Sequence, residues 1–183
     1  MKTRRVPVAL AALALGFGLA ACTSEVGGQA TPSSQTSATS SATADPDNPF
    51  AGLSSCTVLD QALSGQNMPK AVPGVADPNN TCLASRPTSG DTPGLVVGLI
   101  FQAVGNYRDN VNNPAKASDG NVNGRPAIEE QEPLKVKGQC AIRFQVRDSR
   151  ALLSISFGSD TAGACEQARD IAAKVEPLLP KNN

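Results

Sequence analysis

The chain of 183 residues contains no histidine and no tryptophan, and aromatic residues make up only 3% of it. The absence of histidine excludes Ser-His-Asp and Cys-His catalysis and every metal site that needs an imidazole ligand. The sequence also lacks a Ser-x-x-Lys motif and a Gly-rich phosphate loop. Sites that stack a ligand on aromatic rings have few rings to use. We therefore expect a protein that is not an enzyme and that holds no cofactor and no metal.

Neither sign of charge dominates the sequence. The chain has 16 basic and 16 acidic residues; without residues 1–21 it keeps 13 basic and all 16 acidic ones, a formal net charge of −3. Proteins that bind nucleic acid need a basic footprint on the surface. We expect no nucleic-acid partner.

The N-terminus has the three parts of a secretory signal. A basic start and a short apolar run precede small residues and a cysteine: Lys2, Arg4 and Arg5, then residues 8–19, then Leu19-Ala20-Ala21-Cys22. This arrangement is the lipobox of bacterial lipoproteins. It predicts a signal peptide over residues 1–21 and a lipidated N-terminus at Cys22, which would anchor the protein at the outer face of the cytoplasmic membrane.

Two alternatives for this segment are a transmembrane helix and a plain signal peptide with a chance cysteine. The uninterrupted apolar stretch is about a dozen residues long, whereas a spanning helix needs roughly 20. The sequence therefore favours a lipoprotein signal peptide.

Composition divides the remainder into a tether and a domain. Residues 22–49 are rich in Ser, Thr, Ala and Gly, and a stretch of this kind cannot bury enough apolar surface to become ordered. Residues 50–181 have the length of one ordinary domain. We expect a disordered Ser/Thr-rich tether followed by one globular domain.

Periodicity within the domain predicts both helices and strands. In chain order we expect a helix over 57–63, a strand buried on both faces over 94–101, an exposed loop or marginal helix over 105–124, an edge strand over 125–128, a hairpin of 140–147 with 151–157, and a helix over 162–176. This mixture predicts an α+β domain, mostly an antiparallel sheet with covering helices.

Four cysteines remain once Cys22 is set aside as the lipidation site, and an even number in an exported chain favours disulfides. Three pairings are open, and the sequence does not choose among them outright. Cys140 opens a strand on its core side and Cys165 lies in the first turn of the helix expected to cover it. We favour Cys56–Cys82 and Cys140–Cys165, each stabilising the fold by about 3.5 kcal/mol in the chain-entropy model.

The sequence resembles the actinobacterial lipoprotein family called domain of unknown function 3558. The resemblance rests on the lipobox, the tether and these motifs: Cys56-Thr-Val-Leu59, Cys82, Val122-Asn-Gly-Arg-Pro-Ala127, Cys140-Ala-Ile-Arg-Phe144 and Cys165-Glu-Gln-Ala168. It implies an exported domain similar to the PsbP-type sandwich of an antiparallel sheet with helices, and it implies no catalytic residues.

Arginines line the polar side of the predicted hairpin, with Arg143 and Arg147 on the strand and Arg150 at the turn. They are the candidate face for an anionic ligand or a partner, or they meet the polar side of a covering helix.

Glutamates form the sharpest acidic cluster: Glu129, Glu130 and Glu132, with Asp119 nearby. Calcium loops place oxygen ligands at alternating positions of a defined turn, and no Asp-x-Asp-x-Asp pattern occurs here. We interpret the cluster as solvated surface.

Three functions remain open. The favoured one is a non-enzymatic envelope module that binds a protein or a cell-wall component. The second is a carrier of a small apolar or lipid-like ligand, with a cavity lined by residues such as Val96, Ile100, Phe144 and Phe157. The third is a hydrolase that uses carboxylates alone, which requires two close carboxylates in a cleft.

Overall fold

An antiparallel sheet of seven strands, in the order β1-β2-β3-β7-β6-β5-β4, is the centre of the computed structural model, which describes residues 47–182. The strands are β1 (Val72–Pro73), β2 (Thr81–Arg86), β3 (Leu95–Gln102), β4 (Ala117–Val122), β5 (Arg125–Gln131), β6 (Gln139–Val146) and β7 (Ser149–Phe157). The predicted signal peptide, Cys22 and most of the predicted tether lie outside the described residues.

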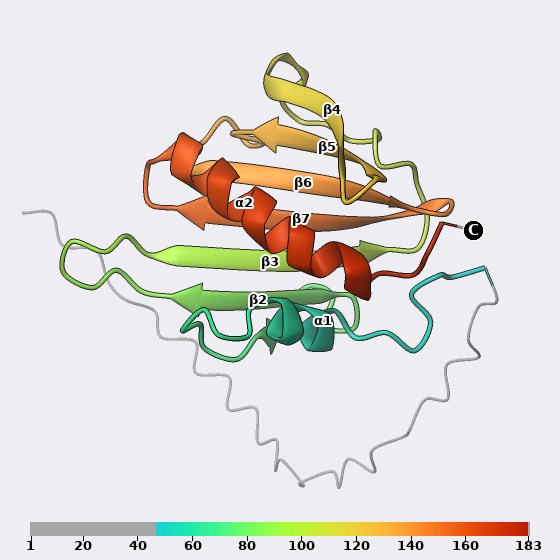
Figure 1. Ribbon diagram of the computed structural model, residues 1–183, viewed down its shortest axis with the longest axis horizontal. Coiled ribbons are helices and arrows are strands. Elements are labelled where there is room, and N and C mark those ends of the chain that lie inside the picture. The colour runs from blue at the N-terminus through green and yellow to red at the C-terminus, as the bar shows by residue number, and fades with distance from the viewer. Residues whose placement is uncertain (1–46, 183) are drawn as a thin grey trace, which may run out of the picture. The chain divides into compact units, whose positions relative to one another are not determined.

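Two α-helices of the described part of the chain cover the same face of this sheet (Figure 1). Helix α1 (Ser55–Ala62) lies against β2 and β3, and α2 (Thr161–Val175) lies against β6 and β7. Short 3₁₀ turns, η1 (Pro114–Lys116) and η2 (Glu176–Leu178), precede β4 and follow α2. The α+β prediction of an antiparallel sheet with covering helices is confirmed.

Alternation along the strands gives the sheet two unlike faces. On β7, Leu153 and Ile155 are buried toward the helices, whereas Ser154 and Ser156 point to the other side and are partly exposed. We call these sides the helix face and the open face. The hydrophobic core lies between the helix face and the two helices.

Polar caps set the starts of both helices. Ser54 accepts a hydrogen bond from the backbone N–H of Thr57, and Asp160 accepts one from Gly163 at 3.0 Å. The apolar residues of α2 repeat at helical spacing and are buried on the sheet: Ala164, Cys165, Ala168, Ile171, Ala172 and Val175. The two predicted helices and the predicted hairpin are present within two residues of their expected starts and ends.

Two predictions about the strands are wrong. The segment predicted as an edge strand is β5, which pairs with both β4 and β6, because residues 117–122 of the predicted loop form the true edge strand. Pro126 is tolerated because the pairing of β5 with β6 begins only at Ala127. Strand β3 is also not buried on both faces, since Val96 on the open face is 40% exposed.

Both expected disulfides are present. Cys56 is bonded to Cys82 and Cys140 to Cys165, and the two Cα atoms are 5.0 Å apart in each pair. The first ties α1 to β2 and the second ties α2 to β6. Each bond therefore fixes one covering helix to the sheet.

Removing the second bond with Cys140→Ala and Cys165→Ala together should lower the free energy of unfolding by about 3.5 kcal/mol, since its loop spans 25 residues. Urea unfolding measured against the intact chain checks this. Cys22→Ser is the control, because it removes a cysteine that lies outside residues 47–182. A loss of less than about 1 kcal/mol would contradict the expectation.

Candidate functional site

The predicted arginine face does not form as a surface. Arg143 and Arg150 are on the open face but are only 4% and 6% exposed, while Arg147 lies in the tight turn between β6 and β7 and is exposed. The sequence pattern gave the correct side of the sheet for Arg143. It could not show that another segment covers that side.

The covering segment is the connection of residues 103–116 between β3 and β4, which we call the strap. Arg150 donates to the backbone oxygens of Asn106 and Asp109 at 3.0 and 2.9 Å and to the side chain of Gln102. Ser149 donates its hydroxyl to the oxygen of Ala103 at 2.6 Å. These bonds hold the first half of the strap on the sheet.

A buried ion pair holds the second half of the strap. Arg143 pairs with Glu130, whose side chain is 0% exposed, and also donates to the backbone oxygen of Asn110 at 3.0 Å. Glu130 accepts in addition from the backbone N–H of Asn113. The two charges neutralise each other, so this part of the open face carries no net charge.

The acidic cluster is divided among three surroundings. Glu129 points to the helix face and pairs with Arg169 of α2, Glu130 points to the open face, and Glu132 lies in the loop after β5. Asp119 pairs with Arg108 at 2.9 Å. Each carboxylate thus has its own cation, and these side chains do not converge in one cleft.

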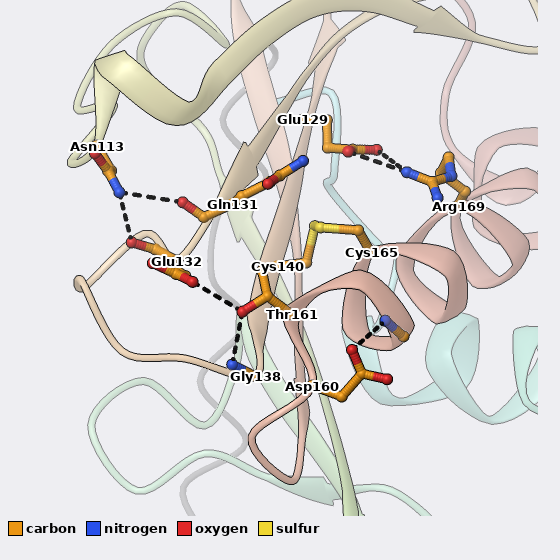
Figure 2. The surroundings of a disulfide bond; sticks show 11 residues. Asn113, Glu129, Gln131, Glu132, Gly138, Cys140, Asp160, Thr161, Cys165 and Arg169 are labelled. Carbon is orange, nitrogen blue, oxygen red and sulfur yellow. Dashed lines mark hydrogen bonds and ion pairs between the residues drawn. A yellow bond between two sulfur atoms is a disulfide. The ribbon is translucent and has the colours of Figure 1, made fainter.

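Glu132 is the centre of a polar corner at one end of the sheet (Figure 2). Its carboxylate accepts from Lys116 and from the hydroxyl of Thr161 at 2.9 Å, and that hydroxyl accepts from the N–H of Gly138 at 3.0 Å. Asn113 donates to the backbone oxygen of Glu132 at 3.1 Å. The hydrogen bond from Lys116, then that from Thr161, hold the pKa of Glu132 below its ordinary value. This corner fixes the strap, the β5–β6 loop and the start of α2 to one another.

The disulfide of Cys140 and Cys165 lies beside the pair of Glu129 and Arg169 in Figure 2. Ligand atoms of Glu129 and the two cysteines lie within 4.8 Å of one another, the spacing of a metal-binding group. Because the two sulfurs are bonded together, neither is a thiolate, and metal binding by cysteine needs the thiolate. This arrangement is a structural bond, not a metal centre.

The four residues predicted to line a carrier cavity do not meet. Phe144 and Phe157 contribute to the core on the helix face, whereas Val96 and Ile100 lie on the open face. The sheet itself separates the two pairs. A cavity formed by this set is therefore excluded.

A different pocket, of about 250 Å³, lies on the open face between the strap and the β5–β6 loop. Its apolar walls come from Pro133, Leu134, Ala141 and Leu152. Its polar side chains come from both flanking segments and from the middle of the sheet: Asn112, Gln139, Ser154 and Ser156. Arg143 also lines the pocket. Sequence reasoning missed it because nothing local indicates that the strap and the loop flank the same strands.

Depressions of similar volume lie elsewhere on the described part, for instance 370 Å³ around Ser64 and 290 Å³ around Arg125. The open-face pocket differs because one of its lining residues, Gln139, has a buried side-chain oxygen with no hydrogen-bond partner within residues 47–182. We take this pocket and the surrounding open face as the candidate site.

Comparison with known proteins adds no relative: no family model, no curated protein and no solved structure matches this chain. The resemblance to domain of unknown function 3558 stays a prediction.

Arg143→Met should lower the free energy of unfolding by about 3–5 kcal/mol, because it leaves the Glu130 carboxylate buried without a partner. Arg147→Met is the matched control and should change it by less than about 0.5 kcal/mol, since Arg147 is exposed. Chemical unfolding of both variants measures the difference. Equal effects at the two positions would contradict the buried pair.

Proposed function

We propose that the chain is an exported lipoprotein, anchored by a lipid on Cys22 at the outer face of the cytoplasmic membrane, whose domain is a non-enzymatic binding module of the cell envelope. The lipobox supports the anchor. The two disulfides support export, since such bonds persist in oxidising compartments. Within residues 47–182, no helix is long and apolar enough to cross a membrane.

The observation that carries the binding proposal is the part of the open face that neither helix nor strap covers. The register places Val72 of β1 beside Leu83 of β2, and Val96 lies on the adjacent strand; these side chains are 59%, 38% and 40% exposed. Apolar side chains gathered on one face of a sheet and left in water are typical of an interaction surface. The pocket continues this surface toward β6.

The size of the pocket favours a partner over a carried ligand. Sites that enclose a whole small molecule measure about 300–1,000 Å³, and this one measures about 250 Å³. A carrier of a small apolar or lipid-like ligand remains the second candidate. The volume of the pocket supports this carrier function only for a ligand with a short apolar chain.

Membership of the family named above, with its PsbP-like arrangement, belongs to the same proposal. The motifs that carry the resemblance most specifically lie at the β4–β5 turn and the start of β5, in β6 and in α2.

The test places a photoreactive amino acid at Val96 on the open face, and separately at Glu166 on the exposed side of α2, in the exported chain. Crosslinking in intact cells should give a defined product from position 96 and none from position 166. The Cys22→Ser variant should leave the membrane fraction and fail to incorporate labelled palmitate.

Equal products from the two positions, or none from either, would contradict a binding module on the open face. Retention of Cys22→Ser at the membrane with undiminished palmitate labelling would contradict the anchor. The two arms are read independently of each other.

A further inference from the structure

We infer that the open-face pocket receives one aliphatic side chain of an extended peptide segment, with Gln139 and the neighbouring polar side chains bonding the peptide backbone. The inference rests on the proposed binding function and specifies the chemistry of the partner.

The strongest observation is the side-chain oxygen of Gln139. This acceptor is buried and has no hydrogen-bond donor within the described residues. A buried polar atom without a partner destabilises the folded state, and native proteins contain few of them. Gln139 lines the pocket and its side chain is only partly buried, so a turn of the carboxamide toward the pocket brings this oxygen to a donor of the ligand. A carboxamide offers the donors and the acceptor that match a peptide group.

The hydroxyls of Ser154 and Ser156 and the amide of Asn112 add further hydrogen-bonding capacity at the same pocket. Two carboxamides and two hydroxyls can bond the N–H and C=O groups of a short extended segment.

The remaining walls are aliphatic. Leu152 and Ala141 form the part on the sheet, and Leu134 stands at the rim, where it is 67% exposed. The lining contains no aromatic ring, so the stacking that sugar rings and bases use is not offered. A volume of about 250 Å³ suits a single side chain and its backbone.

The charges at the pocket indicate which residues of the peptide flank the inserted aliphatic one. The only charged side chain in the lining is Arg143, which is neutralised by Glu130, so the inserted side chain is uncharged. Lys135 and Lys137 lie on the same loop as Leu134, are exposed, and form no ion pair with any described residue. They favour an acidic residue beside the aliphatic one.

The walls are preformed, which lowers the entropy lost on binding. In Figure 2, Thr161 and Glu132 hold the base of the β5–β6 loop, and Asn113 joins the strap to it through the backbone oxygens of Gln131 and Glu132. Both sides of the pocket are thus fixed at one corner.

The test is a selection of peptides from a random displayed library, with the exported chain carrying Cys22→Ser as the bait. Selected peptides should be enriched in Leu, Ile or Val next to Asp or Glu. Leu134→Ser and Gln139→Leu should each lower the affinity for the selected peptide about tenfold or more, because each removes one contact of the bound segment. Val136→Ser is the matched control: Val136 is another exposed aliphatic residue of the loop but does not line the pocket, so its effect should stay within about twofold.

Gln139→Leu provides a second readout, because removing an unpaired acceptor should leave the melting temperature unchanged or raise it. A lowered melting temperature would assign Gln139 a structural role and overturn the inference. So would a selection without aliphatic enrichment, or a Val136→Ser effect as large as that of Leu134→Ser. Displacement of the peptide by N-acetylglucosamine but not by acetyl-leucine methylamide would assign the pocket to sugars instead. If crosslinks form at position 96 while the selection fails, the proposed function stands and this inference falls.

Discussion

The ion pair between Arg143 and Glu130 is the interaction on which the arrangement of the open face depends. It lies on the open face between β5 and β6, where both side chains are almost completely buried beneath the strap. A buried pair of this kind is weak evidence for stability, since desolvation offsets most of the attraction. Together with the contacts of Arg150, the pair determines where the strap lies. It therefore determines which part of the sheet stays uncovered.

The two faces of the sheet differ in what covers them. On the helix face, each disulfide fixes one helix, and the aliphatic side chains between them form the core. On the other face, Val72, Leu83 and Val96 of β1, β2 and β3 stay exposed. Exposed apolar side chains there, and a buried side-chain oxygen of Gln139 without a partner, are compatible with a stable domain only because the helix face stabilises it.

The local sequence pattern was sufficient to predict some helices and strands but not others. The β6–β7 hairpin and α2 alternate or repeat so regularly that their apolar positions predict their buried sides, and the position of Cys165 on α2 followed from that. Strand β4 was missed although Asn123-Gly124 is a strong hairpin turn, because Ala117–Val122 contains Ser, Asp, Gly and Asn, residues that disfavour strands. The burial of Arg143 and Arg150 depends on the strap, and contacts across more than 30 residues leave no periodic signal.

The central proposal is that the open face, and not the helix face, binds a partner in the cell envelope. Hydroxyl-radical footprinting of the anchored protein in intact cells, compared with the purified exported chain, tests it most directly. The account predicts protection of Leu83, Val96 and Leu134, with no change at the exposed residues of α2. Protection confined to α2, or identical footprints in the two samples, would contradict it.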